Sequence, residues 1–163
     1  MCSFTSSTVP TVGGPATYVH PGQLVVSSGP GVLSTILGSC VAVCLHDPQA
    51  AIGGINHYLL PTAGSEADQP GRYGPSAIDE LVHLMMVRGA ARERMVAHVI
   101  GGASVLVAFN QADHLGLRNV GVARTALAQH RIPVLGADVG GTRGRKVLFT
   151  PRDGSVSVSL IGA

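Results

Sequence analysis

The chain has 163 residues, of which 45% are hydrophobic and 12% are charged, and its formal net charge is +2. This length fits a single domain that buries most of its apolar surface, and the composition excludes disorder over the whole chain. With no Trp, 4% aromatic residues and little net charge, the chain lacks the features typical of nucleic-acid-binding proteins.

The N-terminal stretch predicts a tail and not a targeting signal. Residues 1–20 are rich in Ser, Thr, Pro and Gly, and they lack the basic and apolar regions of a secretory signal. The longest weakly polar run, residues 32–45, is shorter than the roughly 20 residues that a membrane helix needs. Three cysteines, an odd number, argue against a disulfide framework. We therefore expect a flexible tail over residues 1–20, one domain over residues 21–163 and a cytoplasmic location.

Most of the remaining pattern is typical of strands. Runs of β-branched and aliphatic residues bounded by Gly, Pro and Asp predict strands over residues 23–28, 32–37, 41–45, 52–60, 95–100, 133–139, 147–150 and 156–161. The last two strands form a hairpin around Asp153-Gly154.

Two segments have helical periodicity. The first begins at an N-cap Ser76, ends at Gly89, and has one apolar stripe made of Ile78, Leu81, Val82, Met85 and Met86. The second covers residues 117–130, with an inner side made of Val120, Ala123 and Leu127. The sequence thus predicts one α/β (α+β) domain in which about two helices pack on a mixed, largely antiparallel β-sheet.

Residues 41–60 read as a hairpin whose turn is Asp47-Pro48-Gln49-Ala50. If the hairpin is symmetric about Pro48 and Gln49, Leu45 faces Ile52 and Cys40 faces His57. Directly opposed side chains share one face with Cβ atoms about 4.5–5.5 Å apart, so the thiol is within hydrogen-bond reach of the imidazole. A bulge of one residue would instead send the two side chains to opposite faces.

A paired thiol and imidazole can perform nucleophilic chemistry. The imidazole accepts the thiol proton, and the resulting thiolate is the nucleophile. Backbone N–H groups at the Gly38–Cys40 bend are suited to holding an oxyanion. The alternative is that Cys40 is a buried apolar residue, the commonest fate of a free cysteine, and spacing alone favours this alternative.

A catalytic imidazole also needs a partner that fixes its tautomer. Ser34 lies an even number of residues before Cys40 and shares its face if the strand continues. Thr35 has the opposite parity, unless Gly38 resets the alternation.

Metal and phosphate sites fit the sequence poorly. Cys40 and Cys44 would lie about 13 Å apart in a strand, too far for two thiolates to share one zinc ion. The glycine clusters lack the spacing of a phosphate-binding loop. No metal and no cofactor are predicted.

Several segments resemble the chemoreceptor glutamine deamidases (CheD) of bacterial and archaeal chemotaxis. In family order they are LGSCVAVCLHDP (37–48), GGINHYLLP (53–61), GRYGPSAIDEL (71–81), IGGASVL (100–106), LGLRNVGVA (115–123) and DVGGTRGRKVLF (138–149). The resemblance implies a β-sheet sandwich with helices, similar to toxin-type glutamine deamidases. It also implies Cys40 as nucleophile and His57 as general base and acid.

The family's third catalytic residue is a Thr six residues before the Cys, a position held here by Ser34, with Thr35 as the fallback. The implied reaction hydrolyses glutamine side chains on the cytoplasmic helical bundle of chemoreceptors to glutamate and releases ammonia, without a cofactor. A CheC-type phosphatase is an implied partner. The competing hypotheses are a non-catalytic module that regulates such a phosphatase and a redox-sensing thiol protein.

Overall fold

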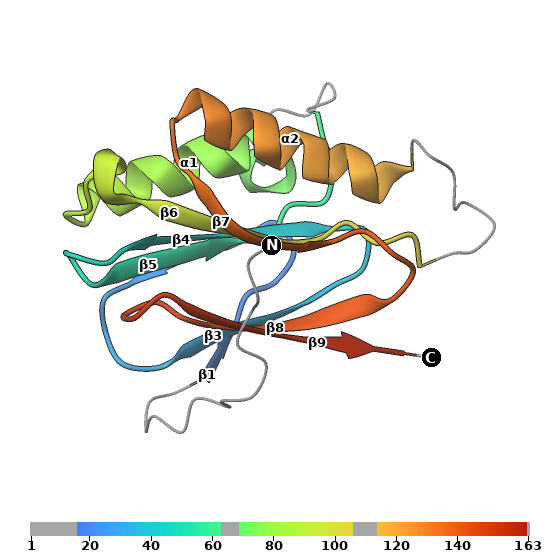
Figure 1. Cartoon of the computed structure of the whole chain (residues 1–163), viewed down its shortest axis with the longest axis horizontal. Helices are drawn as coiled ribbons and strands as arrows, with labels where there is room; N and C mark the ends of the chain where they lie inside the picture. The colour runs from blue at the N-terminus through green and yellow to red at the C-terminus, as the bar shows by residue number, and fades with distance from the viewer. Residues whose placement is uncertain (1–15, 63–68, 106–113, 163) are drawn as a thin grey trace.

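The computed structural model describes residues 16–62, 69–105 and 114–162. In these ranges the chain forms three layers, with two α-helices on a five-stranded sheet and a four-stranded sheet on its other side (Figure 1). The predicted combination of about two helices with a mixed, largely antiparallel β-sheet sandwich is confirmed. Within the same ranges, no helix is long and apolar enough to cross a membrane.

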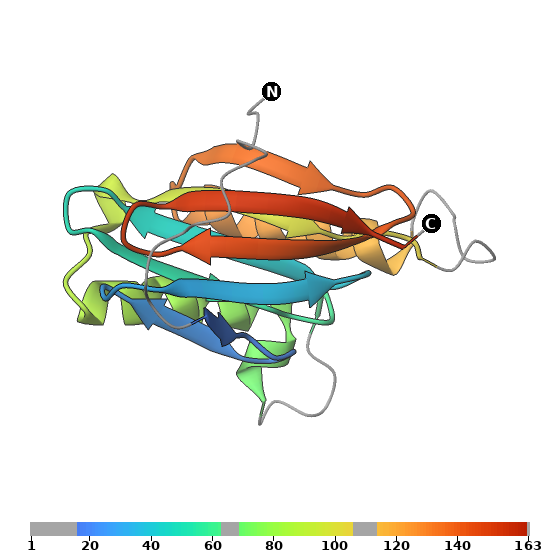
Figure 2. The same ribbon diagram turned by 90° about the horizontal axis from the view of Figure 1, so that it is seen from below.

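The four-stranded sheet has the order β1-β3-β8-β9 and faces the viewer in Figure 2. Its strands are β1 (Ala16–Tyr18), β3 (Val32–Leu37), β8 (Gly144–Thr150) and β9 (Ser155–Ile161), and β1 runs parallel to β3. The hairpin predicted around Asp153-Gly154 joins β8 to β9. Strand β1 falls inside the region predicted as a tail, so that prediction is wrong for residues 16–18; residues 1–15 lie outside the described ranges.

The five-stranded sheet has the order β2-β5-β4-β6-β7. Its strands are β2 (Leu24–Ser27), β5 (Ile52–Asn56), β4 (Val41–Asp47), β6 (Val96–Gly101) and β7 (Val134–Val139). Because helices cover one face and the other sheet covers the opposite face, every residue of β4 and β5 is buried. This burial on both faces explains why their sequences are continuous apolar runs without alternation.

The helices are α1 (Gly74–Val87) and α2 (Leu115–Gln129), and the short 3-10 helices are η1 (Pro70–Arg72) and η2 (Arg92–Arg94). The predicted inner residues of both α-helices are buried, except that Met86 is 43% exposed. Helix α1 begins earlier than predicted, because its N-cap is Tyr73 and Pro75 is accommodated in the first turn. The Ser76 hydroxyl donates to the Pro70 carbonyl at 2.6 Å and does not cap the helix.

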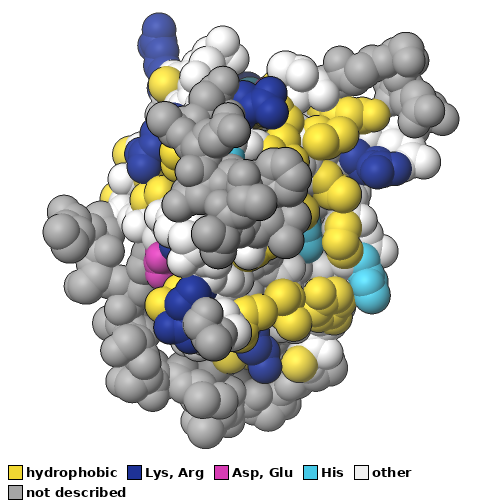
Figure 3. Space-filling model, turned by 90° about the vertical axis from the view of Figure 1, so that its right-hand side faces the viewer, with side chains coloured by type: hydrophobic (Ala, Val, Ile, Leu, Met, Phe, Trp, Pro, Cys, Tyr) yellow, Lys and Arg dark blue, Asp and Glu magenta, His cyan; other side chains and the backbone are white. Residues whose placement is uncertain are grey.

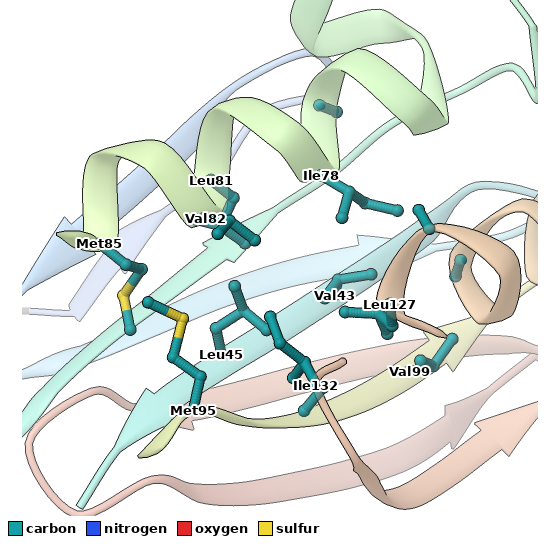
Figure 4. Packing of buried hydrophobic residues seen from close by; sticks show 14 of the residues in the cluster. Val43, Leu45, Ile78, Leu81, Val82, Met85, Met95, Val99, Leu127 and Ile132 are labelled. Carbon is teal, nitrogen blue, oxygen red and sulfur yellow. The ribbon is translucent and has the colours of Figure 1, made fainter. Parts of the chain in front are cut away.

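Two apolar cores separate the layers. The first lies between the helices and the five-stranded sheet and includes Val43, Leu45, Leu81 and Leu127 (Figure 4). The second lies between the two sheets, and Cys40 packs at its margin. The candidate site is in this second layer, where the chain passes from β3 of one sheet to β4 of the other.

Candidate active site

The hairpin of β4 and β5 has a longer turn than predicted. Leu45 pairs with Gly54 and Asp47 pairs with Ile52, so four residues, 48–51, lie between the strands. The predicted register with Leu45 opposite Ile52 is therefore wrong by two residues. The longer turn forms because Asp47 accepts the Gln49 and Ala50 N–H groups and Ala51 adopts a positive φ of 55°.

A register error of two residues leaves the faces of the strands unchanged, because side chains alternate with a period of two. Beyond the end of β5, Val41 and Tyr58 exchange backbone hydrogen bonds of 3.2 and 3.0 Å. Cys40 and His57 are therefore diagonal neighbours on one face and not directly opposed residues. Val41 and Tyr58 point into the core under the helices, whereas Cys40 packs against the core between the sheets.

The imidazole of His57 is held from the opposite sheet. Its Nδ1 lies 2.8 Å from the hydroxyl oxygen of Thr35 in β3, and the two side chains are 2% and 0% exposed. The Thr35 hydroxyl donates its proton to the Val19 carbonyl at 2.7 Å. A hydroxyl has one proton, so Thr35 must accept a hydrogen bond from Nδ1–H of His57. This leaves Nε2 of His57 unprotonated, which is the state that a general base requires.

The hydroxyl that contacts His57 is thus that of Thr35 and not that of Ser34. Ser34 pairs with Leu148 and Tyr18 in the four-stranded sheet, and as the strand neighbour of Thr35 its side chain points to the opposite face. The parity argument that favoured Ser34 assumed one continuous strand up to Cys40. The chain instead bends at Gly38 and Ser39 as it changes sheets, which resets the alternation.

Replacing Thr35 by Val is expected to lower the turnover number roughly 10²-fold, because His57 loses the partner that fixes its ring and tautomer. Ser34→Ala should stay within about twofold of the wild type, since its side chain lies on the outer face. Steady-state turnover rates of the two folded variants test this assignment. A large loss for Ser34→Ala with little loss for Thr35→Val would contradict it.

Burial keeps the resting site uncharged. It lowers the pKa of His57 to about 4, against a smaller opposing effect of the Val19 backbone. It also raises the pKa of the Cys40 thiol, and the backbone N–H of Cys40 partly opposes this rise. Near neutral pH the pair is therefore a neutral thiol beside a neutral imidazole and not a preformed ion pair.

Cys40 is half-buried, whereas His57 is buried. A cavity of about 200 Å³ is lined by Ser39, the residue before Cys40, and by Ala103, Ser104, Val105 and the start of α2. Cys44 is fully buried, which raises its pKa well above the ordinary value. Among the described residues, no three His, Cys, Asp or Glu side chains are grouped so that they could hold a metal ion.

Comparison with known proteins shows which family this chain belongs to. The family model described as CheD chemotactic sensory transduction matches residues 59–160. A probable chemoreceptor glutamine deamidase CheD of Anaeromyxobacter dehalogenans is 50% identical over 141 residues, which are 86% of this chain and 82% of that protein. The chain belongs to the CheD family. Another CheD relative, from Sulfurimonas denitrificans, carries the same functional name and is 40% identical over 88% of this chain and 93% of its own length.

A solved structure shares the fold of this CheD chain. A DUF152-family protein of Neisseria meningitidis aligns over 91% of this chain and 76% of its own length, with a TM-score of 0.52 and 14% sequence identity. This likeness supports the arrangement of sheets and helices. The site assignment depends on the residues of this chain.

Sequence reasoning overlooked Asn119 of α2. Asn119 is fully buried, and its side-chain amide donates hydrogen bonds of 3.0 Å to the carbonyls of Ser39 and Leu59. It lies on the inward stripe of α2, beside Val120 and Ala123. A polar residue on the apolar face of a predicted helix is the signal that would have found it.

Proposed function

We propose that this chain is a protein-glutamine deamidase that converts glutamines on the cytoplasmic helices of chemoreceptors to glutamate and acts in chemotaxis, with Cys40 as the nucleophile. The observation that carries the proposal is the buried Thr35–His57 hydrogen bond on the face that Cys40 shares. The substrate is inferred from the printed names of the CheD relatives, which are similar over most of the chain.

The proposed reaction has two halves. Cys40 Sγ attacks the glutamine carboxamide carbon while Nε2 of His57 takes the thiol proton. The tetrahedral oxyanion lies near the Cys40 N–H, the group that also lowers the pKa of this thiol. His57 then returns the proton to the departing ammonia, which leaves a thioester. Water activated by Nε2 hydrolyses the thioester, so that glutamate forms and the thiol is restored.

Exposed apolar residues at one end of the molecule favour a protein substrate over free glutamine. Exposed large hydrophobic side chains lie where β3, β6 and β9 end and where α2 begins, and apolar side chains gather on this end of the molecule (Figure 3). They are Ile36, Val105, Leu117, Leu160 and Ile161. Such a surface is typical of protein docking sites and exceeds what one small polar amino acid requires. A CheC-type phosphatase as a second partner stays a prediction from the sequence resemblance.

The function is tested with a purified cytoplasmic fragment of a chemoreceptor. The wild-type protein should release ammonia and add about one mass unit for each modified glutamine, as expected for hydrolysis through a thioester. Free glutamine at the same concentration is the control and should react far more slowly. An unchanged receptor mass after prolonged incubation with folded protein would refute the proposal.

The low pKa of His57 predicts an acid-tolerant enzyme. His57 acts as a base only when it is neutral, and with its pKa at about 4 it stays neutral well below the usual 6.5. We therefore expect the acid limb of the kcat/KM profile to have its midpoint near pH 4, measured between pH 3.5 and 8 with circular dichroism as a check on folding. A midpoint near 6.5 would show that the imidazole is solvated during catalysis.

A further inference from the structure

Asn119 ties together the two chain segments that carry the proposed nucleophile and base. One N–H of its side-chain amide reaches the carbonyl of Ser39, which directly precedes Cys40. The other reaches the carbonyl of Leu59, two residues after His57. Both distances are 3.0 Å, and both partners are backbone groups, so the bonds restrain the main chain on either side of the site.

Asn119 is itself held rigidly. Its own backbone carbonyl accepts a hydrogen bond of 2.6 Å from the hydroxyl of Tyr58, a fully buried residue adjacent to His57. The orientation of the amide is also determined, because a flipped amide would direct its oxygen at two carbonyl oxygens. Its Oδ1 is buried and has no hydrogen-bond partner within the described structure. The hydrogen bonds of the side chain are therefore the two that its N–H groups donate.

The close approach of α2 that allows these bonds depends on glycine. A Cβ atom at Gly116 would lie 2.3 Å from the Gly102 carbonyl oxygen, and one at Gly102 would lie 2.4 Å from a methyl carbon of Val120. The helix therefore rests directly on the end of β6. The Gly102 N–H in turn donates to the Cys40 carbonyl at 2.9 Å, so the same contact also holds the nucleophile's own backbone.

We infer that Asn119 is a positioning residue that sets the distance between Cys40 and His57 by fixing the Ser39 and Leu59 carbonyls to α2. This inference rests on the proposed function for its catalytic consequence. Diagonal neighbours on a strand pair are farther apart than opposed residues, so the separation of the thiol from Nε2 depends closely on where each segment is held. Misplacement by about 1 Å can cost roughly 10²-fold in rate.

The decisive variants are Asn119→Ala and Asn119→Asp. The aspartate keeps the size of the side chain but at neutral pH offers no donor to the two carbonyls. If Asn119 is a positioning residue, both variants should lower kcat roughly 10²-fold with KM nearly unchanged. Leu127→Ala is the matched control, because it lowers the melting temperature through lost packing in the same helix but keeps both bonds, and its kcat should stay within about twofold of the wild type.

A second readout does not need the receptor substrate. Iodoacetamide alkylation of Cys40 is followed against pH by peptide mapping. Its midpoint in both Asn119 variants should move upward, toward that of His57→Ala, because the imidazole no longer assists deprotonation. A purely structural role would leave this midpoint unchanged. If the wild type alkylates with assistance from His57 but deamidates no receptor, the proposed function fails while the positioning role stands.

Tyr58→Phe covers the case in which the Asn119 variants do not fold, since it removes only the hydroxyl that holds the Asn119 carbonyl. It should lower kcat several-fold and move the alkylation midpoint in the same direction. The inference would be overturned if folded Asn119→Asp had the wild-type alkylation midpoint and a kcat within about twofold of the wild type. Where the Asn119 variants do not fold, the same result for Tyr58→Phe would overturn it.

Discussion

Replacing Cys40 by alanine is expected to lower the rate of receptor deamidation at least about 10⁴-fold, because no other group then forms the thioester. His57→Ala should cost a comparable factor, since a neutral thiol with a raised pKa is a poor nucleophile without a base. The double variant should be little worse than either single one, because the two groups act as a unit. Ammonia release and receptor mass are measured over hours, so that such slow rates can still be detected.

Cys44→Ala is the matched control for this loss. Cys44 lies in the adjacent strand but is 1% exposed within the core between the sheets. Its removal should cost some stability and leave the turnover number within about twofold of the wild type. Deamidation that persists in Cys40→Ala and disappears in Cys44→Ala would show that the nucleophile has been assigned to the wrong thiol.

The strands and helices of this fold follow from local patterns. Apolar stripes at helical spacing located α1 and α2, and the Gly89 stop is observed with a φ of 110°. The β8–β9 hairpin followed from Asp153-Gly154 and its flanking strands. What local patterns could not supply was β1, because its three exposed residues have little apolar signal and are placed by pairing with β3.

Sequence reasoning predicted that Cys40 and His57 share one face of the strand pair, but it did not predict which residues hold them. Cys40 and His57 share a face even though the turn is two residues longer than assumed, because a shift by an even number preserves the alternation. Thr35 and Asn119 were beyond local reasoning for a different reason. Thr35 reaches His57 from another sheet, and Asn119 reaches both segments from a helix far along the chain. Contacts of this kind depend on how the layers stack.

Replacing Asp47 by alanine is expected to lower the free energy of unfolding by about 2–3 kcal/mol, because its buried carboxylate is the acceptor for several hydrogen bonds. The Asp47 side chain is fully buried, and its carboxylate accepts hydrogen bonds from the Gln49, Ala50 and Ala91 N–H groups and from Arg94. It therefore links the β4–β5 turn to the segment that follows α1. Without it, three partly buried backbone donors and the Arg94 guanidinium lose their acceptor. Chemical denaturation at pH 7 measures the loss.

The stability that Asp47 contributes should decrease as the pH falls. Burial acts to raise the pKa of Asp47, but Arg94 and the backbone N–H groups outweigh it and hold that pKa at about 2. The carboxylate therefore contributes its full stability above the unfolded pKa of roughly 4, and that contribution is lost as the pH falls toward 2. Wild type and Asp47→Ala should thus converge in stability under acid.

Asp79→Ala separates this effect from the loss of any ion pair. Asp79 contacts His130 at 2.7 Å, but its side chain is 68% exposed, so the expected cost is below about 1 kcal/mol. Asp47 lies at the end of β4 remote from Cys40, so folded Asp47→Ala should keep its turnover number within about twofold of the wild type. Equal losses of stability in the two variants would mean that Asp47 is solvated and does not link the turn to the segment after α1.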